Sequence, residues 1–123
     1  MKMKFTSTDK APAALGPYSQ AVSVNGLLFT SGQIALDPAT GEIVGSDVQA
    51  QAEQVCKNLA AVLEANGLTF TDAVKTTCFL ADMGDFAAFN EVYGKYFTGK
   101  PARSCVAVKT LPKNVPVSYT HLT

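Results

Sequence analysis

The stretch Pro101-Ala102-Arg103-Ser104-Cys105-Val106-Ala107-Val108 combines the pattern of a β-strand with one fully charged side chain. Residues 106–108 favour a half-buried strand, and Pro101, which has no backbone N–H, suits its first position. Arg103 stands near the entry of this strand, where its guanidinium must meet an anion, a carboxylate side chain or water. Its forked donors suit a carboxylate held by two parallel hydrogen bonds. The alternative is an edge-strand arginine that lies in solvent or pairs with Asp or Glu.

Turn signals and apolar periodicity divide the rest of the chain into strands and helices. Asn25-Gly26 separates two β-prone runs and is typical of a type I′ hairpin turn, because both turn positions need a positive φ. Asp47 and Asp85 each precede apolar residues at spacings of three and four, so each is an expected helix N-cap. The predicted order is β-β-β-α-β-α-β-β, with elements over residues 4–6, 18–24, 27–31, 48–65, 73–81, 86–97, 103–109 and 115–122.

Two helices of this size can cover one face of a mixed sheet, which predicts an α+β fold. The opposite face of the sheet would then stay exposed and would be partly apolar. Its apolar members are expected to be Val22, Val24, Leu28, Val106 and Val108. Because a large exposed apolar face favours association, we expect a homo-oligomer in which sheets pack against one another.

The composition argues against several classes of protein. The chain has 123 residues, enough for one domain with a real core, so residues 1–123 are treated as a single domain. Ten Lys or Arg residues balance ten Asp or Glu residues, which leaves no basic field to attract nucleic acid or an anionic membrane. Three cysteines without C-x-x-C spacing argue against a disulfide framework, and reduced thiols fit a cytoplasmic protein.

The remaining sequence signals also argue against secretion, membrane insertion and metal chemistry. The N-terminus lacks the apolar core of a signal peptide, and no run of about 18 apolar residues could span a membrane. The single histidine is His121. We therefore expect neither a zinc site nor a Ser-His or Cys-His catalytic pair.

Four short segments at the ends of elements carry the remaining chemical signals. Taken alone, each has an ordinary explanation: a half-buried strand tyrosine, a bulge, a solvated helix asparagine and a small core cysteine. The segments are Gly16-Pro17-Tyr18-Ser19-Gln20, Thr30-Ser31-Gly32-Gln33-Ile34, Phe89-Asn90-Glu91-Val92-Tyr93 and Pro101-Ala102-Arg103-Ser104-Cys105. In this order and spacing, and followed by Leu-Pro-Lys, they resemble the Rid (YjgF-type) family of imine and enamine deaminases, also called the L-PSP endoribonuclease family. The resemblance runs from about Phe5 to Val115.

The resemblance implies a chorismate-mutase-like α+β subunit and a homotrimer with active sites in the clefts between neighbouring subunits. It also implies a reaction, the hydrolysis of 2-imino or 2-enamino acids to 2-oxo acids and ammonia. Such 2-iminobutanoate/2-iminopropanoate deaminases remove reactive metabolites. The partner is then a small 2-imino or 2-oxo carboxylic acid, and no cofactor or metal is implied.

Each site residue takes its implied role from the matching family motif. By this resemblance Arg103 is the catalytic residue that anchors the substrate carboxylate. Tyr18 lines the pocket, Ser31-Gly32 lies beside the substrate, Asn90 forms part of the pocket wall, and Cys105 contributes mainly through its backbone. The residues permit this chemistry, because an iminium carbon is already electrophilic and needs only a positioned water and a few hydrogen-bond donors.

Two departures from the family pattern stand out. Ser118 stands where a family glutamate helps to position the attacking water, and Pro116 removes a backbone donor from the last strand. Residues 115–123 are therefore treated as an atypical C-terminal tail, which resembles a foreign or misread end more than a diverged strand. The loop at residues 98–100 is shorter than is usual before the Pro-Ala-Arg-Ser motif.

Three functions are compatible with these observations to different degrees. The first is the imine deaminase, with Arg103 as anchor. The second is a non-catalytic trimer that binds 2-oxo acids or other small carboxylates, which the serine at position 118 favours. The third is a ribonuclease or translation inhibitor, which the absence of a basic stripe, a histidine pair and a metal site argues against.

Overall fold

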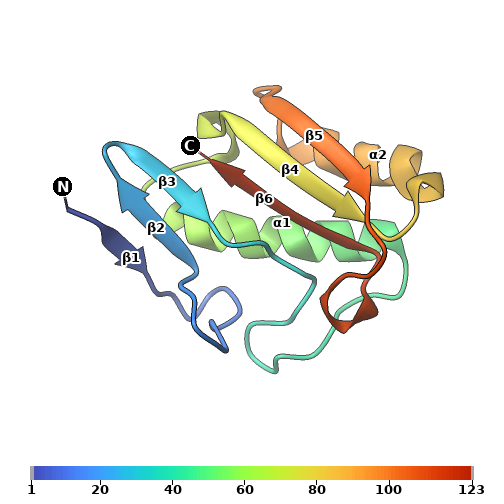
Figure 1. Ribbon diagram of the computed structural model, residues 1–123, viewed down its shortest axis with the longest axis horizontal. Helices are drawn as coiled ribbons and strands as arrows, with labels where there is room; N and C mark the ends of the chain where they lie inside the picture. Colours follow the sequence, from blue (N-terminus) through green and yellow to red (C-terminus); the bar gives the residue numbers. More distant parts are fainter. Residues whose placement is uncertain (1, 123) are drawn as a thin grey trace.

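The computed structural model describes residues 2–122, and for residues 119–122 it describes only the backbone. Within this range the elements follow the predicted order (Figure 1). The helices are α1 (Val48–Glu64) and α2 (Phe86–Tyr96), with short 3₁₀ turns η1 (Phe70–Asp72), η2 (Met83–Asp85) and η3 (Pro112–Asn114). The strands are β1 (Lys4–Thr6), β2 (Ala21–Val24), β3 (Leu27–Thr30), β4 (Lys75–Leu80), β5 (Ala102–Ala107) and β6 (Val117–Leu122).

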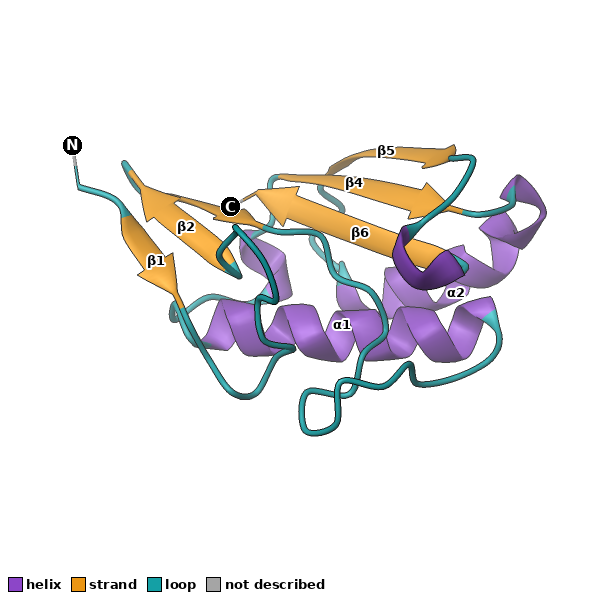
Figure 2. Ribbon diagram, turned by 60° about the horizontal axis from the view of Figure 1, so that its bottom comes forward, coloured by secondary structure: helices purple, strands orange, loops and turns teal. Residues whose placement is uncertain are grey.

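The strands form one mixed sheet in the order β1-β2-β3-β6-β4-β5. Neighbouring strands are antiparallel except β4 and β5, which are parallel and are joined through α2. Both helices lie on the same face of the sheet, as predicted (Figure 2). The last strand of the chain therefore inserts into the middle of the sheet, between β3 and β4.

The β2–β3 hairpin has the turn that its sequence predicts. Asn25 and Gly26 have φ angles of 52° and 78°, which is the left-handed conformation that a type I′ turn requires at both positions. Val24 and Leu27 face each other across the start of the ladder. The turn thereby sets the register of the two strands that lead to the Tyr18 and Ser31 segments.

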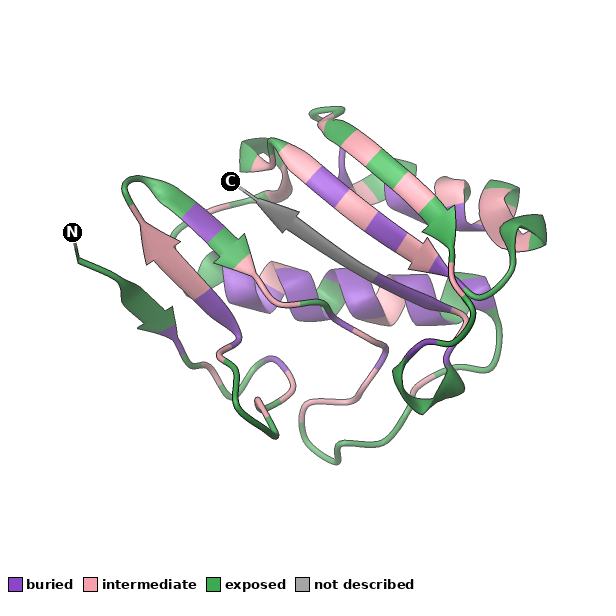
Figure 3. Ribbon diagram, viewed as in Figure 1, coloured by how far each residue is buried: buried purple, intermediate pink, exposed green. Residues whose placement is uncertain are grey.

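The main core lies between the sheet and the two helices. Buried and partly exposed residues alternate along β4 (Figure 3). The buried ones, Thr76, Cys78 and Leu80, face the helices. They pack with apolar side chains from both helices and from β6. These include Val55 and Leu59 of α1, Phe89, Val92 and Tyr93 of α2, and Val117 of β6.

The two helices begin differently. Asp47 is the N-cap of α1 and accepts a hydrogen bond from the backbone N–H of Ala50 at 2.8 Å, as predicted. The prediction that Asp85 caps α2 is wrong, because no side-chain capping bond from Asp85 is found. Asp85 already belongs to η2, with φ −86° and ψ 2°, so it lacks the extended backbone of an N-cap. Asp82 caps η2 instead, by accepting from the Gly84 N–H at 2.8 Å.

The face of the sheet opposite the helices is partly apolar, as predicted, although one expected member lies on the other face. Leu28 was expected there, but it is buried on the helix side, and its neighbours Leu27 and Phe29 are 44% and 39% exposed. A shift of one residue along a strand exchanges the two faces, which explains the difference. Phe5 and Val106 extend this outer face and are 59% and 46% exposed.

The helices of the described residues 2–122 are all too short or too polar to cross a membrane.

Candidate functional site

Arg103 lies on β5 and points to the helix side of the sheet. It pairs in register with the buried Thr76 of the parallel neighbour β4, so both side chains share the face that α2 covers. Its Nη1 donates a 2.7 Å hydrogen bond to the amide oxygen Oδ1 of Asn90 on α2. The guanidinium carbon is 4.7 Å from the ring centroid of Tyr93 and 5.4 Å from that of Phe86. The hydrogen-bond partner described for Arg103 is thus a neutral amide, which does not neutralise the positive charge of the guanidinium.

A cavity of about 550 Å³ opens beside this arginine. It is lined by Tyr93, Gly94, Phe97, Thr98, Lys100, Pro101 and Arg103. Two of these side chains are cationic, and no Asp or Glu is among the lining residues described. The cavity therefore favours an anion. Lys100, in the short loop before β5, is a residue that sequence reasoning missed; its position directly before the Pro-Ala-Arg-Ser motif could have indicated it.

Tyr18, Ser31 and Gly32 meet at a second cavity, of about 570 Å³. Ser118 of β6 also lines it, so the position where the family glutamate is expected faces this cavity. Most of the remaining wall is apolar. The other lining residues are Pro12, Ala13, Leu15, Gln20, Gln33, Ile34, Leu36, Pro112 and Lys113.

Two buried amides hold the walls of this second cavity in place. Gln20 donates to the carbonyls of Thr8 and Pro12 at 3.0 and 2.8 Å, and accepts from the Thr8 N–H at 2.7 Å. These bonds tie down the loop that contributes Pro12 and Ala13. Because an unpaired buried amide is costly, the loop conformation and the amide stabilise each other.

Asn58 of α1 does the same for the opposite wall. Its Nδ2 donates to the carbonyls of Ile34 and Leu36 at 3.2 and 3.0 Å. Gln20 belongs to the quoted segment at residues 16–20, but neither amide was predicted as a site residue. For Asn58 the signal was available, because it lies three residues after Val55 and four before Val62, on the buried stripe of the helix.

The contacts of Ser31 and Cys105 indicate structural roles for both residues. The Ser31 hydroxyl donates to the carbonyl of Ser19, which ties the end of β3 to the Tyr18 segment. Cys105 is the register partner of Cys78 and packs against the core. Burial raises the pKa of the Cys105 thiol, and burial raises that of Cys78 to about 12. Both sulfurs are therefore neutral thiols near neutral pH rather than nucleophilic thiolates.

The chain does not bring all its predicted site residues together. Arg103, Asn90 and Cys105 lie at the β5–α2 edge, whereas Tyr18, Ser31, Gly32 and Ser118 line the other cavity. Strands β6 and β4 separate β3 from β5, so these two strands are roughly 14 Å apart at the usual strand spacing. Asn90, which was expected in the pocket wall, holds the guanidinium of Arg103. Within the described residues, no cluster of three His, Cys, Asp or Glu side chains is placed to hold a metal ion.

Comparison with known proteins decides the family. The family model described as Endoribonuclease L-PSP matches residues 8–118, which include every predicted site residue. The chain belongs to the Rid family, also called YjgF or L-PSP. The match ends at Ser118.

Relatives of this Rid protein cover almost its whole length. It is 49% identical to Reactive Intermediate Deaminase A of Arabidopsis thaliana, a chloroplastic protein, over 95% of this chain and 63% of that one. A crystal structure from Thermotoga maritima is 49% identical, has a TM-score of 0.96, and matches 100% of this chain and 97% of that one. This similarity confirms the predicted chorismate-mutase-like α+β fold.

A second solved structure bears on the kind of ligand. E. coli TdcF, determined with bound serine, is 44% identical to this chain, with a TM-score of 0.92. The similarity covers 98% of this chain and 97% of TdcF. Serine carries a small carboxylate, the group for which Arg103 is chemically suited.

Proposed function

We propose that this Rid protein hydrolyses reactive 2-imino and 2-enamino acids to 2-oxo acids and ammonia. The observation that carries the proposal is the half-buried guanidinium of Arg103, which is held by an amide oxygen and opens with Lys100 onto one cavity. One N–H of Arg103 is engaged by Asn90. The remaining donors of the guanidinium can bind a carboxylate by two parallel hydrogen bonds.

Hydrolysis of the C=N group requires mainly that the substrate and a water molecule are held in position. The substrate carboxylate is attached to the C=N carbon, so binding it to Arg103 fixes the carbon that water attacks. Water adds to this carbon, the C–N bond then breaks, and the nitrogen leaves as ammonia while the carbon becomes a 2-oxo group. Groups that stabilise charge as it develops on the nitrogen and on the attacking water lower the barrier.

In this proposal, residues of the second cavity position the attacking water. Tyr18, Ser31 and Ser118 bring hydroxyl groups to its wall. Because one chain keeps this wall two strands away from Arg103, the proposed active site forms between copies, with Arg103 of one subunit facing the Tyr18 cavity of the next. We propose a homotrimer, and the exposed apolar face around Phe29 and Val106 supports such an assembly.

A specific observation favours a second candidate, a carboxylate-binding protein without turnover. Ser118 lines the Tyr18 cavity where a family carboxylate is expected. A serine hydroxyl can donate a hydrogen bond to a water, but it is a far weaker base than a carboxylate. The anion site around Arg103 would be intact in such a protein, and its ligands would be the same small 2-oxo acids.

The test is ammonia release from 2-iminopropanoate generated freshly in the assay. The wild-type protein is expected to accelerate the release over the uncatalysed rate, and Arg103→Ala is expected to lower kcat/KM by at least 100-fold, because a charged bidentate contact is lost. Lys57→Ala, which removes an exposed cation on α1, is the matched control and should retain full activity. Equal rates for wild type and Arg103→Ala would refute the proposal. Calorimetric binding of 2-oxobutanoate without any acceleration would favour the second candidate.

A further inference from the structure

We infer that Tyr93 is a positioning residue, which holds the guanidinium of Arg103 in the orientation that binds a carboxylate. The inference deepens the proposed function and rests on it for the identity of the ligand. Tyr93 lies on α2, one turn from Asn90, and its ring centroid is 4.7 Å from the guanidinium carbon. A cation at this distance from an aromatic ring is within the range of a cation–π contact.

The ring of Tyr93 is itself fixed from several sides. Its hydroxyl forms a 2.8 Å hydrogen bond with the hydroxyl of Thr76, and this pair is buried in the core. Phe97 stacks on the ring with a centroid distance of 4.5 Å and an interplanar angle of 15°. Burial also raises the pKa of the Tyr93 hydroxyl, so the group stays neutral near neutral pH. Tyr93 is therefore a rigid surface for the cation above it.

Asn90, Tyr93 and Phe86 all contact the guanidinium, and Tyr93 is the nearer of the two rings, at 4.7 Å against 5.4 Å for Phe86. Asn90 holds Nη1 by its amide oxygen, and the Tyr93 ring lies close to the guanidinium carbon. A flexible arginine would have to be ordered when a ligand binds, at a cost in affinity, whereas a side chain ordered beforehand avoids that cost. Tyr93 and Arg103 also line the same cavity, so a carboxylate entering it meets an arginine already in place.

The proposal separates two parts of the Tyr93 side chain. The aromatic face acts on Arg103, whereas the hydroxyl acts on Thr76 and stabilises the core. Tyr93→Phe keeps the face, and Tyr93→Leu removes it. Val92→Ala is the matched control, because it removes buried volume from the same helix at a residue that packs in the main core.

The experiment measures the Kd for 2-oxobutanoate by calorimetry, together with kcat and KM for ammonia release. Tyr93→Leu is expected to raise Kd and KM about tenfold, with kcat changed less than about threefold, because ligand binding weakens while the reacting groups remain. Tyr93→Phe and Val92→Ala should stay within about threefold of wild-type Kd, although both lower the thermal midpoint. A folded Tyr93→Leu protein with wild-type Kd would overturn the inference.

A double-mutant cycle keeps the test decisive. In the Arg103→Lys background, Tyr93→Leu should weaken binding by less than about threefold, because the planar group that the ring holds is gone. Equal weakening in both backgrounds would show a purely structural role and overturn the inference. If Tyr93→Leu does not fold, Tyr93→Met, which fills similar volume without a π face, replaces it with the same expected Kd. Tyr93-dependent binding of 2-oxobutanoate without ammonia release would support this inference while refuting the proposed hydrolysis.

Discussion

At the residue scale, a carboxylate at position 118 would add a general base to the wall of the Tyr18 cavity. Ser118 lines that cavity and is nearly buried. Ser118→Glu is expected to raise kcat for 2-iminopropanoate by about 100-fold, because a positioned general base contributes roughly two to four orders of magnitude. KM should change little, since Arg103 binds the substrate carboxylate. The measurement is steady-state ammonia release.

The control for this substitution is Ser118→Gln, which has similar size and hydrogen-bonding groups but cannot take up a proton at neutral pH. It should not reproduce the gain in kcat. If Ser118→Glu and Ser118→Gln give the same rate as wild type, water activation in this protein does not depend on position 118.

At the residue scale, the need of Arg103 for a partner could be predicted, but the partner could not. A guanidinium beside a buried strand must be satisfied, which follows from the sequence alone. That the partner is Asn90 depends on how α2 packs on β5, since the two residues are 13 positions apart. Gln20 was missed for the same reason, because its partners are carbonyl groups of the loop at residues 8–12. The place of Asn58 on the buried stripe of α1, by contrast, could have been read from the sequence.

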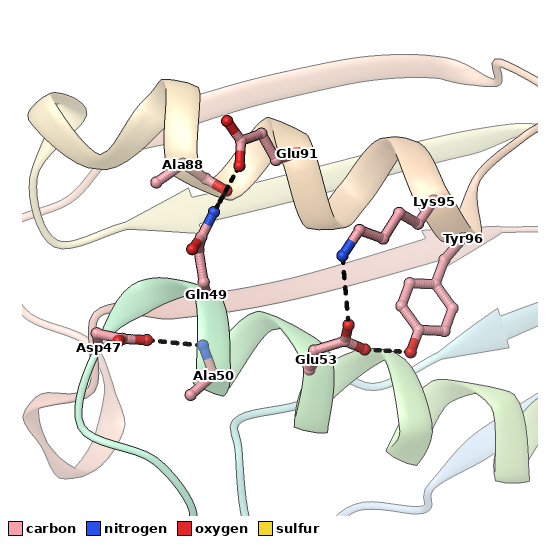
Figure 4. A network of polar contacts seen from close by, with 8 residues as sticks. All are labelled: Asp47, Gln49, Ala50, Glu53, Ala88, Glu91, Lys95 and Tyr96. Atoms are coloured by element: carbon pink, nitrogen blue, oxygen red, sulfur yellow. Dashed lines mark hydrogen bonds and ion pairs between the residues drawn. The ribbon is translucent and has the colours of Figure 1, made fainter.

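At the element scale, polar side chains join the outer surfaces of α1 and α2 (Figure 4). Gln49 donates to the Glu91 carboxylate at 2.8 Å and to the Ala88 carbonyl at 3.2 Å. One turn further along α1, Glu53 accepts a hydrogen bond from the Tyr96 hydroxyl. These contacts hold α2, the helix that carries Asn90 and Tyr93, at a defined position against α1.

The Tyr96–Glu53 contact makes stability depend on alkaline pH. The hydrogen bond to the Glu53 carboxylate raises the pKa of Tyr96 to about 12, against an ordinary value of about 10 in the unfolded chain. Between these values the unfolded chain loses its proton while the folded protein keeps it, so the free energy of unfolding falls as pH rises from about 10 to about 12. Tyr96→Phe should make that fall less steep in urea unfolding followed across this pH range.

Glu53→Gln provides an independent check on the same contact. It keeps a hydrogen-bond acceptor but removes the negative charge, so the decline between about pH 10 and 12 should again be less steep than in wild type. Cys78, whose pKa burial raises to about 12, contributes to the decline in all three proteins. Identical slopes in wild type, Tyr96→Phe and Glu53→Gln would contradict the assignment.

Also at this scale, the periodicity of apolar residues and the turn residues predicted which helices and strands exist. The sequence did not predict every detail of strand register and helix capping. The β2–β3 turn and the Asp47 cap were predictable because each depends on adjacent residues. The face of Leu28 was not, because a single-residue shift in an apolar run cannot be resolved without its partner strand. The first residue of α2 was predicted correctly, but its cap was not, since a preceding 3₁₀ turn leaves no distinct sequence signal.

At the scale of the whole molecule, strand order decides where the site can be. A mixed sheet under two helices was predictable from the pattern of elements, but the insertion of β6 between β3 and β4 was not. This insertion separates Tyr18 from Arg103 within the chain. The predicted site residues therefore form two groups, and the account requires a neighbouring copy to join them.

Mixing two defective variants tests whether one active site is built from two chains. Arg103→Ala and Tyr18→Ala damage opposite groups, and each alone should release ammonia at close to the uncatalysed rate. When the two are unfolded together and refolded at equal concentration, about one quarter of the interfaces should pair an intact Arg103 with an intact Tyr18. We expect recovery of about one quarter of wild-type activity, whereas a mixture no more active than its two components would show that the site is not shared between chains.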